Sequence, residues 1–307
     1  MNKGDQMKYR IEKPWLYLIS DRDWTVNQFF DVYQIGQSKR KKWLLEKKLL
    51  VNKKSCNLND SISMGCEIAL CCFEDKVIDY AFDQQDCKIV YEDEFVLIVS
   101  KPSQMIIHSE NKEEKGTLNS VIANYYCKQG IATTVRPIHR LDKDTTGCVL
   151  YSKVEFFQPF LDEQLSKNTI HRTYIAICKG LIPWKKKTVK LAIGKDRHHN
   201  QRQRVAISGK EAITHIEVLQ QGEKRKITMV KCCLETGRTH QIRVHMQAIG
   251  YPLLGDSLYG QSSRFIQRCA LHAWKISWIH PITGNILNVE DPTPDEILDC
   301  LFSERVA

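Results

Sequence analysis

The feature that most constrains the fold is a series of short strand-like runs that starts after Cys87 and continues through most of the remaining chain. Several of these runs alternate with period two, so that Trp274, Ile276 and Trp278 would share one face of a strand. Helical stretches interrupt the runs irregularly, which predicts an α+β fold with a largely antiparallel sheet rather than a doubly wound parallel one. The expected strands cover 88–91, 95–100, 149–151, 171–178, 214–219, 227–234 and 273–279, and the expected helices about 117–128, 156–166 and 240–249.

The composition is that of an ordinary globular protein, with 42% hydrophobic and 26% charged residues in 307. The longest apolar runs, 68–73 and 95–99, are too short to cross a bilayer, so we expect no membrane partner. The segment Met1 to Gln6 has no apolar stretch behind its charge, which predicts a cytoplasmic protein without a signal peptide.

Twelve cysteines are present, but none forms a C-x-x-C pair. Most lie inside apolar runs, where a free thiol packs as a small hydrophobic group. The spacings needed for a zinc ribbon or a redox motif are missing. We therefore expect reduced, buried thiols, and no metal site.

Residues 24 to about 75 are expected to form a small separate unit with two helices followed by short strands at 49–51 and 67–70. Ser38 is the expected N-cap of the second helix. The segment 39–54 carries eight Lys or Arg residues against one Glu. A solvated helix face would explain this charge, but same-sign blocks repel one another unless a polyanion neutralises them. The candidate RNA-binding residues are Lys39, Arg40, Lys41 and Lys42.

This stretch resembles the S-four-like RNA-binding domain, a two-helix unit that ends in a small sheet. The resemblance rests on three short segments, although Cys66 stands where that family usually has Asp. It implies an RNA-binding module over 1–82, ahead of a catalytic domain over 83–307. The three segments are 37–40, 50–53 and 64–68.

The segment from Arg136 to Gly147 concentrates two arginines, a histidine and two carboxylates in a polar turn that leads into an apolar run. Such a loop is a common place for catalytic groups, and a carboxylate here could act as nucleophile or general base. From these residues alone, a surface turn with local ion pairs explains the pattern equally well.

A second segment, 234–250, contains an apolar helical stripe that ends at Gly250, with Thr239 as the expected N-cap. Arg238 precedes the helix, where it and the free backbone amides could bind a phosphate. Arg243 lies within the helix, from which it could pair with a partly buried carboxylate. His240 and His245 are five residues apart, a spacing that does not suit a zinc pair on one helix face.

A third segment, 171–180, is a strand in which Tyr174 interrupts small and aliphatic residues. Taken alone, such a tyrosine is more often a packing residue than a chemical one. Together, and in this order, the three segments resemble the RluA-type pseudouridine synthase family. The resemblance covers 88 to 290 and includes 139–142 with Gly147, 172–180, 236–245, 250–260, 271–273 and 280–281.

The resemblance implies a mixed sheet in two halves with the active-site cleft between them. It also implies an isomerase that converts uridine to pseudouridine in structured RNA without a cofactor. Asp142 corresponds to the catalytic aspartate, and Tyr174 to the tyrosine that packs on the base and helps to remove its C5 proton. Arg243 corresponds to the basic residue that keeps the aspartate ionised, and Arg140 to the side chain that enters the RNA stack.

The candidate site residues are therefore Asp142, Tyr174 and Arg243 for catalysis, with Arg140, His139, Arg238 and His240 for RNA binding. Ribosomal RNA is the favoured partner because of the basic N-terminal unit, transfer RNA is possible, and we expect a monomer. The alternatives are a catalytically silent RNA-binding assembly factor, a glycosidase that uses Asp142 with Asp144 or Asp256, and a metal-dependent RNA hydrolase.

Overall fold

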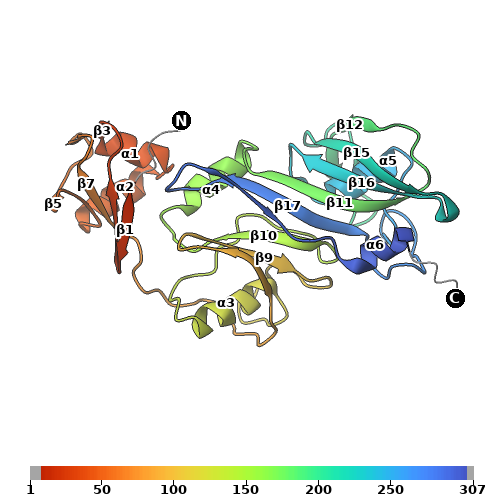
Figure 1. Cartoon of the computed structure of the whole chain (residues 1–307), viewed down its shortest axis with the longest axis horizontal. Helices are drawn as coiled ribbons and strands as arrows, with labels where there is room; N and C mark the ends of the chain where they lie inside the picture. The colour runs from red at the N-terminus through yellow and green to blue at the C-terminus, as the bar shows by residue number, and fades with distance from the viewer. Residues whose placement is uncertain (1–7, 303–307) are drawn as a thin grey trace.

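The computed structural model describes residues 8–302, which fold into a small N-terminal unit and a larger elongated domain (Figure 1). The elements of the N-terminal unit are β1 (Tyr9–Glu12), β2 (Trp15–Ile19), β3 (Trp24–Thr25), α1 (Val26–Val32), α2 (Gln37–Leu45), β4 (Leu49–Val51), β5 (Lys54–Ser55), β6 (Ser61–Ile62) and β7 (Glu67–Cys71). Its main sheet has the order β1-β2-β7-β4-β5. The two strands before residue 24, which the sequence pattern did not predict, are thus part of this sheet.

The two helices of this unit start differently. A capping box starts α1, in which the Thr25 hydroxyl accepts from the Gln28 backbone N–H and the Gln28 side chain accepts from the Thr25 backbone N–H. Helix α2 has Gly36 as N-cap and no side-chain cap, so the predicted cap at Ser38 is wrong. Ser38 lies inside the first turn because the helix begins earlier than its basic run suggests.

Aromatic side chains join the N-terminal unit to the large domain. Phe156, just before α4 (Gln158–Ser166), lies with its ring centroid 4.8 Å from that of Trp43 and 5.2 Å from that of Tyr33. These rings belong to one buried cluster that also includes Phe95 and Phe157 of the large domain. The N-terminal unit is therefore packed onto the large domain through a shared core, rather than tethered to it.

The large domain is built on a nine-stranded sheet, in which β12-β15-β16-β11-β17-β10-β9-β8 follow one another and β18 also pairs with β17. The pairing of β10 with β17 is parallel and the other strand pairs of this sheet are antiparallel, which confirms the predicted α+β class. The strands are β8 (Lys88–Glu92), β9 (Val96–Lys101), β10 (Thr146–Ser152), β11 (His171–Lys179), β12 (Lys186–Lys190), β15 (Ile213–Gly222), β16 (Ile227–Leu234), β17 (Leu271–Ile279) and β18 (Ile286–Glu290).

Helices cover this sheet and a small hairpin extends from it. Helix α3 (Leu118–Lys128) packs beside β9 and β10, and α5 (Gln241–Ala248) lies near β15 and β16 (Figure 1). The hairpin of β13 (Ile193–Lys195) and β14 (Gln203–Val205) forms its own two-stranded sheet beside α5. The remaining elements are η1 (Glu223–Arg225) and α6 (Asp295–Phe302). Lys186 and Lys187, part of a basic run, lie in the exposed strand β12.

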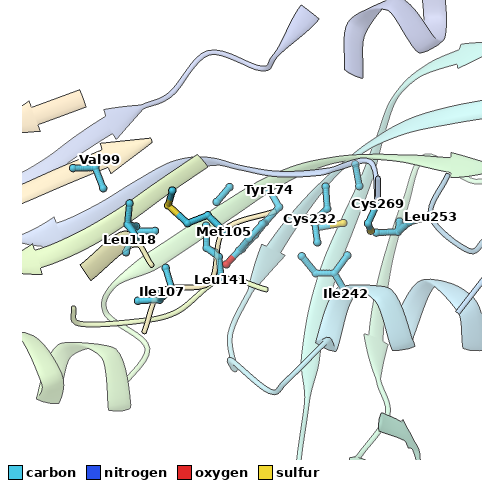
Figure 2. Close-up of a cluster of buried hydrophobic side chains, with 14 of the residues drawn as sticks. Val99, Met105, Ile107, Leu118, Leu141, Tyr174, Cys232, Ile242, Leu253 and Cys269 are labelled. Carbon is cyan, nitrogen blue, oxygen red and sulfur yellow. The ribbon is translucent and has the colours of Figure 1, made fainter. Parts of the chain in front are cut away.

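A continuous hydrophobic core runs beneath both halves of the sheet. Figure 2 shows Val99 and Leu118 of the first half and Ile242 and Leu253 of the second half, with Leu141 and Tyr174 between them. The core lies beneath the loop 136–147, which contributes Leu141 to it.

The described residues also bear on the earlier expectations about compartment and thiols. No helix among them has the length and hydrophobicity needed to cross a membrane. All twelve cysteines fall within the described part of the chain and are free thiols. Met1 to Gln6, on which the expectation about a signal peptide was based, lie outside the described residues.

Candidate active site

The loop that carries Asp142 is held rigidly at its exit. Gly147 follows the loop at the start of β10 with φ +109°, and a Cβ there would lie 2.3 Å from the carbonyl oxygen of Ala273 in β17. Only glycine fits such a close approach. Lys101 supports the loop from below, because its fully buried ammonium donates to the carbonyl oxygens of Met105 (2.8 Å) and Lys143 (2.9 Å).

Helix α5 brings a cation to this loop from the other half of the sheet. Arg243 Nη1 lies 3.4 Å from Asp142 Oδ2. Its Nε and Nη2 donate to the two oxygens of Asp256, each at 2.8 Å. Arg243 therefore holds one carboxylate by a bidentate pair and presents its remaining nitrogen to the other.

Asp256 is the tighter partner of Arg243. The sequence pattern did not identify this pairing. Its side chain is fully buried, and one of its oxygens also accepts the backbone N–H of Leu258 and Tyr259. Burial opposes ionisation, but the hydrogen bonds from Arg243 outweigh it and lower the pKa of Asp256. The arginine is thus fixed in a pose that reaches Asp142, whose side chain remains 21% exposed.

Tyr174 lies on β11 and faces the same cavity, with 6% of its surface exposed. Burial raises its pKa, so the phenol is protonated at neutral pH. The cavity has about 590 Å³ of empty space, which includes space open to solvent. Its lining residues include Arg140, Asp142, Arg172, Tyr174, Leu234, Arg238, His240 and Arg243.

The predicted RNA-binding residues near this cavity divide into exposed and buried ones. Arg140 is exposed at its rim. His139 is buried, its Nε2 accepts from the Leu150 backbone N–H, and burial together with the charge of Arg172 lowers its pKa to about 3. The prediction that His139 contacts RNA is therefore wrong in this structure, where the side chain supports the loop from inside.

Arg238 is exposed beside the start of α5, where its Nε donates to the Glu211 carbonyl oxygen at 2.8 Å. The N-cap of α5 is His240 rather than Thr239. His240 has φ +57°, and its Nε2 lies 3.8 Å from Asp142 Oδ1. His245 is fully buried and bonds Thr214 and the Leu191 carbonyl, so the two histidines do not converge.

The basic residues on α2 also divide into a buried one and more exposed ones. Arg40 is buried and donates to the Ile35 carbonyl, to Asn27 Oδ1 and to Asp31 Oδ1, each at 2.6 Å. It is a structural residue, which corrects its prediction as an RNA contact.

The remaining three basic residues of the tract reach the surface to different extents. Lys39 pairs with Glu155 of the large domain at 2.8 Å, and Lys42 lies 3.7 Å from Glu46. Lys41 is exposed on the outer face of the helix.

Two further cavity residues were not singled out from the sequence. Arg172 is buried with its Nε unpartnered, and a Cβ at Gly237 would lie 2.7 Å from its Nη1. Tyr259 lies behind the cavity with the Arg243 guanidinium 5.1 Å from its ring centroid. Their positions depend on contacts between distant segments, which no local pattern records.

Comparison with known proteins gives consistent results. A family model described as RNA pseudouridylate synthase matches residues 95–248. The uncharacterized RNA pseudouridine synthase YhcT of Bacillus subtilis is 38% identical over 83% of this chain and 84% of its own length. YlyB of the same organism, also an uncharacterized RNA pseudouridine synthase, is 34% identical over 98% of this chain and 96% of its own length. The ribosomal large subunit pseudouridine synthase D of Pseudomonas aeruginosa is 35% identical over 83% of both chains.

A solved structure shares the fold. The human RNA pseudouridylate synthase domain containing 1 matches with a TM-score of 0.57 at 24% identity, over 67% of this chain and 83% of that chain. With the sequence matches, this shows that the chain belongs to the RluA-type RNA pseudouridine synthase family, as its motifs predicted. It is accordingly an isomerase that acts on RNA.

Proposed function

We propose that this chain isomerises uridines in ribosomal RNA, with Asp142 as the catalytic carboxylate. The observation that carries the proposal is the placement of Asp142 in the cavity that Tyr174 also lines, beside an arginine whose other partner is fully buried. Of the two carboxylates that contact Arg243, Asp142 is accessible and Asp256 is buried, so Asp142 is the one that can touch a nucleotide.

A uridine must leave the RNA stack to reach this cavity, at a cost of a few kcal/mol. The exposed Arg140 at the rim is placed to offset that cost by stacking in the vacated position and contacting phosphates. Arg172 and Arg238 line the same cavity. With Asp256 neutralising Arg243, these side chains leave the cavity positive, which suits a phosphate backbone.

The reaction breaks the C–N glycosidic bond of uridine and forms a C–C bond between the same sugar and C5 of the same base. Asp142 can attack the anomeric carbon or remove a neighbouring sugar proton, and either route uses its carboxylate form. Arg243 helps to hold that carboxylate in place, because its Nη1 faces Asp142 Oδ2. The new C–C bond requires the C5 proton to leave.

Tyr174 acts on the base in this proposal. Its ring offers an apolar face to a flipped uracil. Its hydroxyl is protonated, so the phenolic oxygen takes up the C5 proton as the hydroxyl releases its own proton to solvent. No redox change, hydrolysis or external group transfer takes place, so the reaction as proposed uses only side chains of this chain.

Ribosomal RNA is favoured over transfer RNA for two reasons. Several relatives are named ribosomal large subunit pseudouridine synthase D. The N-terminal unit, which we propose is the S-four-like module, adds exposed Lys41, Lys53 and Lys54 at a second surface. We expect a cytoplasmic monomer that binds structured RNA at both surfaces, with an affinity that falls steeply as salt rises.

The proposal is tested with Asp142→Asn and with Asp144→Asn as the matched control. Asp144 lies two residues away in the same loop, and its carboxylate bonds Gln104 at 2.8 Å. On a ribosomal RNA transcript with tritium at uridine C5, we expect Asp142→Asn to lose at least about a thousandfold in tritium release, as for a lost catalytic nucleophile. Asp144→Asn should retain activity. Full activity of Asp142→Asn would overturn the assignment.

The glycosidase alternative needs a second free carboxylate, and here Asp256 is committed to Arg243. Free uracil in the product would nevertheless support it, whereas base retained as pseudouridine would reject it. Mapping pseudouridines in total RNA from cells with and without the gene identifies the target positions. A map without any difference would favour a catalytically silent assembly factor.

A further inference from the structure

A chain of hydrogen bonds reaches the cavity from the hairpin formed by β13 and β14. The backbone N–H of Gln203 lies 2.7 Å from the Tyr259 hydroxyl oxygen. The same oxygen lies 2.9 Å from Nδ1 of His240. The other ring nitrogen of His240, Nε2, lies 3.8 Å from Asp142 Oδ1.

The direction is fixed by chemistry only for the first member of this chain. A backbone N–H can only donate, so the Tyr259 oxygen accepts from Gln203. The proton of the same hydroxyl can be donated to Nδ1 of His240, which lies 2.9 Å away. Donation in that direction leaves the proton of a neutral imidazole on Nε2, the nitrogen that faces Asp142.

The surroundings keep His240 neutral and Tyr259 fixed. Burial, followed by repulsion from Arg243, lowers the pKa of His240 despite the attraction of Asp142. Tyr259 is 6% exposed, and the guanidinium groups of Arg243 and Arg202 lie 5.1 Å and 5.2 Å from its ring centroid. These contacts restrain the ring and so keep its oxygen within reach of His240.

The backbone of His240 indicates that this position is constrained. With φ +57° and ψ 21° it occupies the left-handed region, which is uncommon for residues other than glycine and in which Asn, Asp and His are enriched. Such a conformation is retained where the surrounding structure holds a side chain in a particular place. Here it turns the imidazole toward Asp142.

We propose that His240 is a positioning residue of the reaction, whose Nε2–H, set by the Gln203–Tyr259 hydrogen bonds, orients Asp142 Oδ1 while Arg243 orients Oδ2. This inference rests on the proposed role of Asp142. The distance of 3.8 Å closes to a hydrogen bond when the nucleotide enters, as contacts around a reacting group commonly tighten in the complex. The carboxylate is then held at both oxygens. His240 at the N-cap of α5 holds Oδ1, and Arg243 in the first turn of the same helix holds Oδ2.

The first test reads the proton position directly and needs no RNA. Long-range ¹H–¹⁵N spectra of the full chain should show His240 as the Nε2–H tautomer. In Tyr259→Phe, which keeps the ring and removes the hydroxyl, the Nδ1–H tautomer should also appear. Tyr251→Phe, a partly buried tyrosine outside the cavity, is the matched control and should leave the spectrum unchanged. A wild-type His240 that carries its proton on Nδ1 would overturn the proposal.

The second test separates hydrogen bonding from backbone strain. His240→Gln places an amide N–H₂ near the position of Nε2, whereas His240→Asn suits the left-handed backbone better but is too short to reach Asp142. In single-turnover tritium release from the ribosomal RNA transcript, we expect Asn to lose about tenfold more rate than Gln, as for one hydrogen bond to a charged group. RNA affinity should be equal in both. Asn as the more active variant would show a purely structural role.

Failure of this inference can be told apart from failure of the proposed function. If Asp142→Asn is active, the catalytic assignment itself fails, whatever the tautomer of His240. If Asp142→Asn is inactive while Tyr259→Phe keeps both the wild-type tautomer and the wild-type rate, the catalytic assignment stands and the positioning role is rejected. Urea unfolding of each variant ensures that only folded protein is compared.

Discussion

Helix α2 and the loop that ends at Gly147 both concentrate charged residues, but they place them differently with respect to water. On α2 one arginine, Arg40, is buried and bonded to its own unit, while Lys41 beside it is exposed. At the loop, Asp142 keeps 21% of its side chain exposed because a second, fully buried carboxylate satisfies Arg243. Charge on α2 therefore divides between a buried structural residue and an exposed one, whereas at the loop one carboxylate stays partly open to solvent beside an arginine that is already paired.

The largest expected effect separates the two carboxylates that share Arg243. Asp256→Ala leaves a buried guanidinium without its bidentate partner, which should lower the free energy of unfolding by about 3–5 kcal/mol. Asp142→Ala removes a longer, partly exposed contact and should change it by less than about 1 kcal/mol. Both should abolish activity. Urea unfolding measures the difference, and equal losses of stability would contradict the division of roles.

The next effect concerns α2. Arg40→Ala removes charge-assisted hydrogen bonds to Ile35, Asn27 and Asp31 and should cost about 2–3 kcal/mol of unfolding free energy, with little direct effect on RNA contacts.

Lys41→Ala is the matched control on the same helix. It should leave stability within about 0.5 kcal/mol and reduce the salt dependence of RNA binding by about one ion. Filter binding across a salt series, beside urea unfolding, gives both quantities. An exchange of the two outcomes would restore Arg40 as an RNA contact.

A separate effect is a pH dependence at His139. Its pKa is about 3 in the folded chain against about 6.5 when unfolded, so the unfolded state binds the extra proton between these values. Stability is unaffected by this group above about pH 6.5 and falls by about 1.4 kcal/mol for each pH unit between about pH 6.5 and about pH 3.

His139→Gln should flatten this slope, whereas the same change at exposed His171 should not. Urea midpoints at several pH values give the comparison. An unchanged slope in His139→Gln would mean that His139 is protonated in the folded chain.

Much of the catalytic domain was predictable because its strands alternate regularly and its motifs occur in one order. Which residue of a charged cluster faces the core was not predictable. Four consecutive basic residues on a helix with 3.6 residues per turn point in four directions, so one of Lys39 to Lys42 must face inward. Which one it is depends on where the helix begins, and the start at Gln37, ahead of the expected Ser38 cap, turns Arg40 toward the core.

The pairing of Arg243 with Asp256 was unpredictable for a related reason. Sequence pattern identified a helix with an arginine that could reach a carboxylate, but two carboxylates were available. The choice depends on how the turn at Asp256 folds back beneath α5, where its oxygens also accept backbone N–H groups. Only the three-dimensional arrangement shows that one carboxylate is anchored and the other left for chemistry.

The two halves of the large sheet meet at a narrow seam, where β10 and β17 pair through Thr146 with His272 and Gly147 with Ala273. Asp142 belongs to one side of this seam and Arg243, with Asp256, to the other. A small rotation of the halves about the seam would therefore alter the 3.4 Å separation of Asp142 and Arg243 while leaving the Arg243–Asp256 pair intact. The ion pair between Asp142 and Arg243 is thus a direct contact across the seam, and its length depends on how the two sides are placed.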